Sequence, residues 1–411
     1  MKTAGAKATG MSRRSLLSRI LSWGVSVLIG SPAISRAASR PPKQAWDFRG
    51  ADLDWQQLEM ATGDTPLIAA QVRGLPVRAL LDSGSGATVI STTLAEKIGL
   101  GRGEKALVGG LSDKAAVQLV RDVDVQLAHV TRRLPFVIVA DLASASAGFG
   151  RPIDMLLGVD AFTDNCVALD FANSRFSVAK SESFQGGQDW KAVALEHGPK
   201  QELFIRASVA GLPPVPLMID LGSSTALMLS TAYARDQGLL KGRLMSTAAI
   251  GGLDGIRTND ALTIPDINIQ GLRVSSIPSL GMREWFVTST VGNIGLPLLA
   301  QFDVVFDVSA GFVWLRPVNP AHRLPMLKDR SGLGFAASPV GLTIVHVATN
   351  SPAQRAGWVA GDRIAAVNGH PVDANYTHGE LWRWRFAPAT TVVKLTMATG
   401  TVRDLTLSDY Y

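Results

Sequence analysis

The sequence predicts a mainly β protein in which one β-rich unit occurs twice and a smaller β-rich unit follows. Short runs of β-branched and apolar residues alternate with Gly, Pro, Asn and Asp between residues 60 and 318. Five landmarks recur there in the same order, at an offset of 137 to 142 residues. Helical patterns are brief, at 92–98 and 231–237. Because β-branched residues favour strands and the interrupting residues favour turns, these observations indicate a repeated β fold.

The five landmarks define the two copies of the repeat. The first copy contains Gly74-Leu75-Pro76, Asp82-Ser83-Gly84-Ser85, 107–111, 156–159 and 167–171. The second copy contains Gly211-Leu212-Pro213, Asp220-Leu221-Gly222-Ser223, 249–253, 293–296 and 304–308. A polar segment that contains glycine, 181–189, joins the copies. We therefore expect two similar lobes, 38–180 and 190–318, related by a pseudo-two-fold axis.

The first 37 residues have the order of an export signal. Arg13 and Arg14 precede a moderately apolar run, 20–29, and the small-residue pattern Ser35-Arg36-Ala37 follows it. This order is typical of a signal peptide, and the apolar run is too short for a stable membrane span. The paired arginines resemble a twin-arginine signal, with a Sec signal or an uncleaved anchor as alternatives. We expect an exported protein, periplasmic or secreted, with no integral membrane span after signal removal.

Length and charge limit what the rest of the chain can be. The 411 residues are too many for one compact core, so two or three domains are expected. Residues 1–37 hold six basic residues and no acidic ones, and beyond them 34 basic residues balance 34 acidic ones. The body of the protein is therefore neutral, and the net charge of +6 does not predict a nucleic-acid partner.

Cysteine and histidine usage argues against metal and cofactor chemistry. Cys166 is the one cysteine of the chain, and its apolar neighbours predict a buried inert thiol. The six histidines lack zinc-ligand spacing, and the sequence has no P-loop, dinucleotide fingerprint or Gly-x-Ser-x-Gly elbow. We therefore expect no cofactor and no metal ion.

In each copy of the repeat an apolar strand runs directly into an Asp-x-Gly-Ser turn. Gly84 and Gly222 lack a Cβ, so the two turns can approach closely and bring Asp82 and Asp220 together. Two adjacent carboxylates cannot both ionise readily, so one keeps a proton while the other is charged. Such a pair can activate a water molecule while its protonated member polarises a carbonyl group.

At these residues the chain resembles the aspartic proteases, both retropepsin-like and bilobal pepsin-like. The resemblance covers residues 60–318 and implies two acid-protease β lobes with Asp82 and Asp220 as the catalytic pair. It further implies that the catalytic loops are supported by Ser83, Gly84, Ser85, Gly222 and Ser223. The family's flaps, the mobile hairpins over its cleft, fall at Gly109, Gly110, Gly251 and Gly252.

The chain departs from the family pattern in two places. The family has Thr or Ser after each catalytic Asp, and its hydroxyl bonds to the opposite loop; Ser83 can do this and Leu221 cannot. We expect the second loop to be held by fewer hydrogen bonds, with Ser223 or Ser224 as substitutes. A hydroxyl at position 221 is expected to add stability if the loop has room. The first lobe has no tyrosine, which favours the retropepsin-like style.

After a linker at 317–329, residues 330–411 carry a different series of motifs. Gly332-Leu333-Gly334-Phe335 precedes a β-like run at 342–347, and Asn368-Gly369 closes the series. The series resembles a PDZ domain, whose name-giving motif is Gly-Leu-Gly-Phe. Consecutive N–H groups of such a turn can hold a C-terminal peptide carboxylate while the peptide adds as a strand. A helix at 378–386 is the expected opposite wall.

The two resemblances together imply an exported aspartic endopeptidase that hydrolyses peptide bonds with Asp82, Asp220 and an activated water molecule. Its PDZ domain would recruit protein substrates or bind a C-terminal peptide ligand. One alternative is a catalytically weak or inactive retropepsin-fold protein that binds peptides and has a regulatory role. Another makes the PDZ domain the main activity, anchoring an envelope complex.

Overall fold

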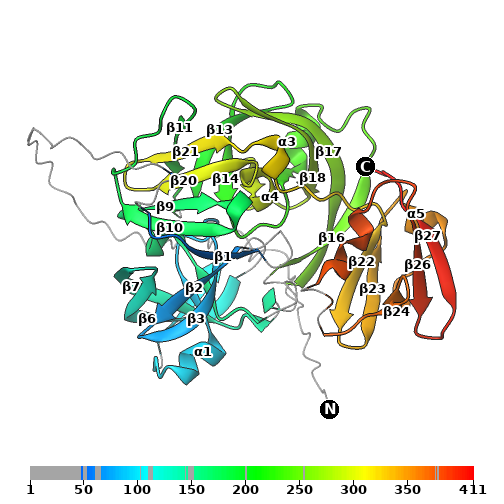
Figure 1. The fold of residues 1–411 in the computed structure, drawn as a ribbon, viewed down its shortest axis with the longest axis horizontal. Helices are drawn as coiled ribbons and strands as arrows, with labels where there is room; N and C mark the ends of the chain where they lie inside the picture. The colour runs from blue at the N-terminus through cyan, green and yellow to red at the C-terminus, as the bar shows by residue number, and fades with distance from the viewer. Residues whose placement is uncertain are drawn as a thin grey trace, which may run out of the picture. The chain divides into compact units, whose positions relative to one another are not determined.

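The computed structural model describes residues 48–411 apart from 50–52, 61–65, 102, 110–113, 144, 147–151, 200, 253–254, 375 and 377–378. The predicted export signal, 1–37, lies outside the described residues. The prediction of a mainly β protein is confirmed, because most elements are strands arranged in three sheets (Figure 1). Within the described part of the chain, no helix has the length and apolar character needed to cross a membrane.

The first copy of the repeat forms a barrel-like part of the largest sheet. Its strands follow the order β1-β2-β3-β8-β4-β7-β6-β5, and an additional pairing of β2 with β6 folds this part of the sheet back on itself. Arg73 and Gly74 both have positive φ and make the two-residue turn between β2 and β3. The strands are β1 (Gln56–Met60), β2 (Pro66–Val72), β3 (Leu75–Leu81), β4 (Val89–Ser91), β5 (Glu104–Gly109), β6 (Lys114–Leu127), β7 (Val130–Ala140) and β8 (Met155–Leu157).

The second copy repeats this arrangement strand for strand. Its order is β12-β13-β14-β19-β15-β18-β17-β16, and β13 pairs additionally with β17, as β2 does with β6. In both copies the strand that leads into the Asp turn lies parallel to the strand of the fourth landmark, 156–159 or 293–296: β3 with β8 and β14 with β19. The strands are β12 (Glu196–His197), β13 (Leu203–Val209), β14 (Val215–Asp220), β15 (Leu227–Ser230), β16 (Ser246–Gly252), β17 (Gly255–Ile269), β18 (Leu272–Met282) and β19 (Gly292–Gly295).

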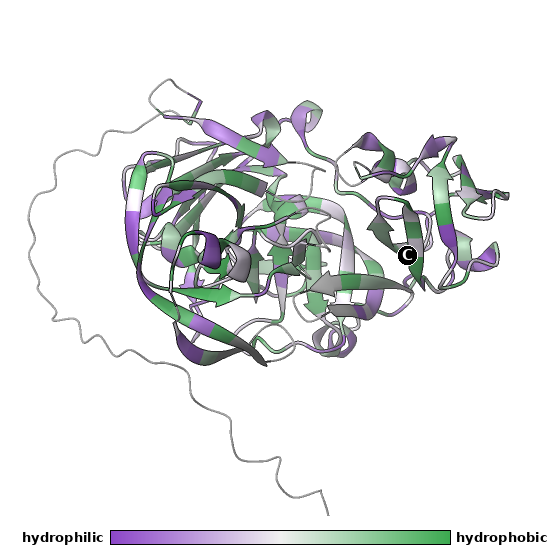
Figure 2. Ribbon diagram, turned by 90° about the horizontal axis from the view of Figure 1, so that it is seen from below, coloured by the Kyte–Doolittle hydropathy of each residue, from purple (hydrophilic) through white to green (hydrophobic). Residues whose placement is uncertain are grey.

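Side-chain periodicity and capping explain the local structure of the two copies. β2 and β13 show the same alternation of buried and exposed positions, and Figure 2 shows hydrophobic and hydrophilic bands alternating along many strands. The two short helices lie where the sequence predicts them. Each is capped by a serine hydroxyl that accepts from a backbone N–H, Ser91 for α1 (Thr92–Lys97) and Ser230 for α3 (Thr231–Asp236).

Strands of both copies join in one antiparallel layer, which we call the platform. Its order is β11-β21-β20-β9-β10-β1, and the last landmarks of the two copies pair directly in it, Leu169 opposite Val304 and Val167 opposite Phe306. One continuous core runs through both copies, from Leu58 to Leu315. The further platform strands are β9 (Asn165–Asp170), β10 (Arg175–Lys180), β11 (Lys191–Ala194), β20 (Phe302–Asp307) and β21 (Phe312–Pro317). Short helical turns follow several strands: η1 (Val159–Ala161), η2 (Phe171–Asn173), α4 (Leu296–Leu299) and η3 (Pro320–His322).

Residues after 330 form a third sheet with a core of its own. Its order is β22-β23-β24-β26-β27, with β25 paired to β24. The core contains Leu342, Ile364 and Leu395, all fully buried. The elements are β22 (Leu333–Ser338), β23 (Gly341–Val347), α5 (Pro352–Arg355), β24 (Arg363–Val367), β25 (His370–Pro371), η4 (Glu380–Phe386), β26 (Val392–Met397) and β27 (Val402–Thr406). The third sheet lies in the same compact unit as the two copies, Pro42–Tyr411.

Candidate active site

The two Asp turns, 82–85 and 220–223, occupy the same place in the two copies. Asp82 directly follows β3, and its N–H donates to Leu157 O of β8 at 3.0 Å. Asp220 is the last residue of β14 and pairs with Gly295 of β19. Each turn closes on a hydrogen bond of 3.3 Å from the serine N–H to the aspartate carbonyl, Ser85 to Asp82 and Ser223 to Asp220. Rigid, buried strands therefore hold both carboxylates.

The turns face each other at very close range. A Cβ placed on Gly84 would lie 2.7 Å from Asp220 Oδ1, and one placed on Gly222 would lie 2.8 Å from Asp82 Oδ1. Side-chain carbons do not approach other atoms so closely, so glycine alone fits at either position. Each carboxylate thus lies against the backbone of the opposite turn. The structure brings together the two aspartates that the sequence analysis selected.

Ser83 joins the two turns, and Leu221 does not. Ser83 Oγ donates to Ile219 O at 2.9 Å and accepts from the N–H of Leu221 at 3.0 Å. The side chain of Leu221 is 1% exposed and belongs to the main core. The space for an added hydroxyl that the sequence analysis allowed at this position is filled by apolar packing. The second turn is held instead by its backbone and by Ser223, whose Oγ accepts from Thr225 N at 3.3 Å.

Burial and mutual repulsion govern the ionisation of the pair. Burial raises the pKa of Asp82 to about 6, although the N–H groups of Gly84 and Ser85 lower it. The pKa of Asp220 is raised to about 7, chiefly by burial and further by the charge of Asp82. The hydrogen bonds that its carboxylate accepts lower this pKa in part. Two such groups share a single proton over weakly acidic pH. This is the protonation state that a water-activating pair requires.

Asn293 is a residue of this site that the sequence analysis did not assign. It lies in β19, and its Nδ2 donates to Asp220 Oδ2 at 2.8 Å. The signal in the sequence was a polar residue in a landmark whose first copy has leucine at the same place, Leu156. In the first copy Asp160 accepts from the N–H and the hydroxyl of Thr88, which follows the turn, at 3.0 and 2.7 Å.

The glycines predicted to form flaps lie in two equivalent hairpins. Gly109 ends β5 and pairs with Lys114 of β6, while Gly110 lies outside the described residues. Gly251 and Gly252 end β16, where Gly252 pairs with Gly255 of β17. The β16 hairpin also touches the third sheet: Thr247 Oγ1 lies 3.1 Å from His346 Nε2 and accepts from Thr349 N at 3.1 Å. The β16 hairpin therefore packs against the third sheet.

Comparison with known proteins bears on the first copy. Residues 68–161 match the sequence profile of the aspartyl protease family. The match includes the first Asp turn and the landmark at 156–159. It supports a protease-type function. No curated protein matches the chain.

The Gly-Leu-Gly-Phe turn of the third sheet is already partly hydrogen-bonded within the chain. Asp329 Oδ1 accepts from the N–H groups of Ser331 and Gly332 at 2.9 and 2.7 Å, and Leu333 N donates to Ser331 Oγ at 3.0 Å. Asp329 is held in turn by the Tyr410 hydroxyl at 3.1 Å and by Arg385 at 3.3 Å. An internal carboxylate therefore lies at the turn that was expected to receive one from a peptide.

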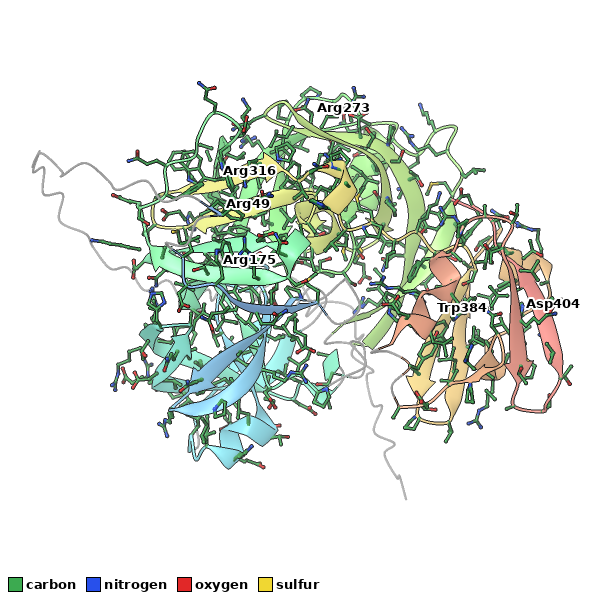
Figure 3. All side chains as sticks on the ribbon, in the orientation of Figure 1. Arg49, Arg175, Arg273, Arg316, Trp384 and Asp404 are labelled. Atoms are coloured by element: carbon green, nitrogen blue, oxygen red, sulfur yellow. The ribbon has the colours of Figure 1, made fainter. Side chains whose placement is uncertain are left out.

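The aromatic side chains around Phe335 pack into the core of the third sheet. Phe335 packs edge-on against Tyr376 and is stacked with Trp384, which belongs to η4 and is labelled in Figure 3. The predicted helical wall is a 3-10 helix, and His378 lies outside the described residues. A Cβ on Gly334 would lie 3.1 Å from His346 Cβ and 3.6 Å from Ala249 Cβ of β16. The face of the third sheet at Gly334 is thus covered by the second copy.

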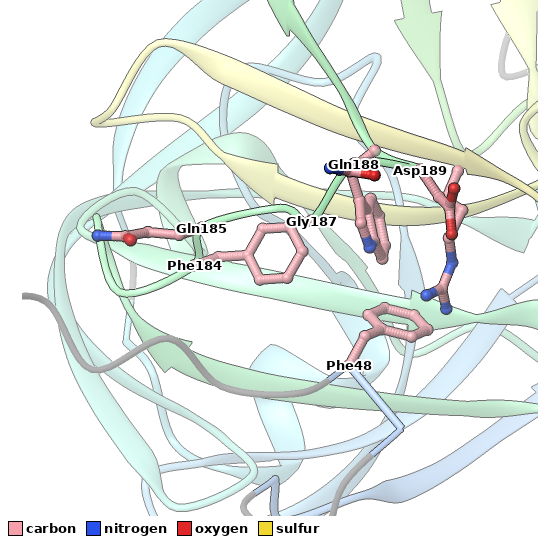
Figure 4. A pocket seen from close by; sticks show the side chains of 8 residues that line it. Phe48, Phe184, Gln185, Gly187, Gln188 and Asp189 are labelled. Atoms are coloured by element: carbon pink, nitrogen blue, oxygen red, sulfur yellow. The ribbon is translucent and has the colours of Figure 1, made fainter.

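A further buried carboxylate, that of Asp303, is paired with arginines away from the two Asp turns. Asp303 of the platform is 0% exposed and is paired with Arg316 at 2.7 Å and Arg49 at 3.3 Å, both arginines being labelled in Figure 3. A cavity of about 190 Å³ beside the platform is lined by three aromatic residues, Phe48, Phe184 and Trp190, together with polar and charged side chains, and by no residue of either Asp turn. Figure 4 shows its lining. Burial raises the pKa of the Cys166 thiol to about 12. That thiol is therefore inert as a nucleophile.

Proposed function

We propose that the protein is an aspartic endopeptidase in which Asp82 and Asp220 activate a water molecule. The observation that carries this proposal is the contact of each carboxylate with the glycine of the opposite turn, 2.7 and 2.8 Å from the position of a Cβ. A carboxylate pair held by two buried strands, with pKa values raised by burial, can share one proton near weakly acidic pH. The match to the aspartyl protease family supports the same reaction.

The two carboxyl groups can carry out every proton transfer that the proposed hydrolysis requires. The ionised carboxylate takes a proton from water as the oxygen attacks the peptide carbonyl carbon, and the protonated carboxyl donates to the carbonyl oxygen. The tetrahedral intermediate then collapses as a proton passes to the leaving nitrogen and the C–N bond breaks. The products are a carboxylic acid and an amine, and the pair regains its shared proton. The opposing turns hold the carboxyl groups of Asp82 and Asp220 in place throughout the reaction, which lowers the entropic part of the activation barrier.

The alternative proposal is a peptide-binding protein with little or no catalysis. Leu221 favours it, since its buried side chain leaves the second turn without the hydroxyl that the family uses. In that case the cleft would bind extended peptides and release them intact. The two proposals differ in a single observable, the appearance of new peptide termini.

We further propose that residues 38–180 and 190–318 act as the two lobes of this enzyme and 330–411 as a PDZ-like module. In the described sheet, β22 pairs only with β23, so its other edge can accept an extended segment of a protein substrate. The Asp329 carboxylate repels a peptide's C-terminal carboxylate at the neighbouring turn, so strand addition carries most of the recognition. Residues 1–37 would export the protein to the periplasm or the medium.

Digestion of a diverse peptide library tests the proposed activity. Library peptides are incubated with the wild type, Asp82→Asn and the control Asp236→Asn, which changes an exposed aspartate of α3. The digestions are run from pH 4 to pH 8 and analysed by mass spectrometry. New peptide termini should appear with the wild type and the control, and almost none with Asp82→Asn. Intact peptides in every sample, together with binding by the wild type, would support the alternative.

A further inference from the structure

The amide of Asn293 breaks the symmetry of the two Asp turns. Asn293 is 1% exposed within β19, and its Nδ2 donates to Asp220 Oδ2 at 2.8 Å. In the first copy β8 lies parallel to β3, with Leu157 opposite Leu81; in the second β19 lies parallel to β14, with Ile294 opposite Ile219. The residue before each of these, Leu156 or Asn293, therefore holds the same structural place. One carboxylate has an amide donor behind it, and the other has an aliphatic side chain.

The contact is polar in a place where the fold favours an apolar side chain. Asn293 Oδ1 is buried and has no hydrogen-bond partner among the described residues. Leaving a buried acceptor unpaired destabilises the folded protein, and leucine at the equivalent place in the first copy avoids that penalty. The Nδ2 bond to Asp220 is the interaction that an asparagine adds here. The arrangement therefore serves Asp220 rather than the packing of β19.

The other contacts of Asp220 show how the hydrogen bond from Asn293 affects its carboxylate. Asp220 accepts from the N–H groups of Gly222 and Ser223, and the titratable group that faces it from the opposite turn is Asp82. Oδ1 and Oδ2 lie 2.7 and 3.1 Å from the position of a Cβ on Gly84, so both oxygens face the first turn, and Oδ2 is also held by Asn293. A donor to Oδ2 fixes the rotation of the carboxylate and stabilises its negative charge.

We propose that Asn293 is a positioning residue that orients Asp220 and keeps this buried carboxylate ionisable for water activation. The proposal rests on the proposed peptidase function of the Asp82–Asp220 pair. Without the amide, burial and the charge of Asp82 would act on Asp220 with one opposing hydrogen bond fewer. The pair would then lose its shared proton at higher pH, and the Asp220 carboxylate would be held only by the N–H groups of Gly222 and Ser223.

The first test is the pH profile of kcat/KM for one cleaved peptide. Asn293→Leu copies the residue of the first repeat and should move the alkaline limb of the profile, which reports loss of the shared proton, to higher pH by about one to two units, the usual effect of a hydrogen bond to a charged group. The acid limb should move less, and kcat should fall more than KM rises, because the orientation of the Asp220 carboxyl group is lost. The control Leu156→Val changes packing at the equivalent place and should leave the limbs where they are. An unmoved or downward-shifted alkaline limb for Asn293→Leu would overturn the proposal.

A second measurement does not depend on activity. In the Asp82→Asn background Asp220 titrates without its charged neighbour, and carboxyl-carbon NMR follows it directly. Adding Asn293→Leu should raise the pKa of Asp220 by about one to two units in folded protein. An unchanged Asp220 pKa would contradict the role of Asn293, whether or not the enzyme cleaves peptides. A raised pKa, together with a wild type that cleaves none of the library peptides, would support the contact and reject the peptidase function.

Discussion

Gly84→Ala is expected to disable the pair by displacing the carboxylate that lies opposite. The new Cβ would lie 2.7 Å from Asp220 Oδ1 and 2.8 Å from its Cγ, whereas ordinary contact begins at 3.4 Å. The carboxylate or the turn must therefore move by about 0.7 Å, and a displacement of about 1 Å in a catalytic group lowers rates by about 10²-fold. Gly84 does not have a positive φ, so the added methyl acts through this contact rather than through backbone strain.

The assay compares kcat/KM for a cleaved peptide with the free energy of unfolding in urea. We expect kcat/KM to fall by about 10- to 100-fold and unfolding to become about 1–3 kcal/mol easier, the usual effect of overpacking. Gly187→Ala is the matched control, because a Cβ there meets nothing within 4 Å and no positive φ is involved. Wild-type activity and stability in Gly84→Ala would refute the close approach of the two turns.

Three other outcomes follow from the same contacts. Burial raises the folded-state pKa of Asp82 and Asp220 above the ordinary 3.8, so the folded state binds more protons than the unfolded state. The free energy of unfolding should therefore fall as the pH rises from about 4 to about 7. Combining Asp82→Asn with Asp220→Asn should remove most of this pH dependence, and an unchanged dependence would contradict the burial of the pair. Leu221→Thr should destabilise by about 1–3 kcal/mol, since it puts a hydroxyl into the main core, and a gain in thermal stability would show that the hydroxyl finds a partner. Asp329→Ala should lower the free energy of unfolding by about 1–3 kcal/mol, because it leaves the N–H groups of Ser331 and Gly332 unpaired. Asp329→Asn keeps an acceptor oxygen and should lower the free energy of unfolding by less. Equal losses for the two variants would contradict the role of Asp329 as acceptor for these N–H groups.

Much of the architecture could be predicted from the sequence because it depends on short-range patterns. The repeat of apolar strands and Gly-rich turns predicted the mainly β class, and the two brief helical patterns became α1 and α3. The glycines of the two Asp turns predicted the close approach of Asp82 and Asp220, because only a residue without a Cβ fits against a carboxylate. These features follow from residue type and spacing alone.

The missed features depend on how side chains meet across elements that are distant in the sequence. Asn293 reaches Asp220 only because β14 and β19 pair in one parallel register. The interpretation of Leu221 rested on the hydroxyl that it lacks, whereas its side chain is buried in a core that both copies share. Asp329 lies in the segment predicted to be a linker, and it accepts a hydrogen bond from Tyr410, which is 81 residues further along the chain. Such contacts require the register and the packing, which residue patterns do not specify.

The most direct test of the central claim compares kcat/KM for the wild type, Asp82→Asn and Asp220→Asn on one peptide at the wild type's optimal pH. If the two turns of a single chain form the catalytic pair, each substitution should lower kcat/KM by about 10²-fold or more, the usual contribution of a general acid or base, while circular dichroism shows an unchanged fold. Near-wild-type cleavage by Asp220→Asn would contradict the account, and a dimer that pairs two copies of Asp82 would then replace it.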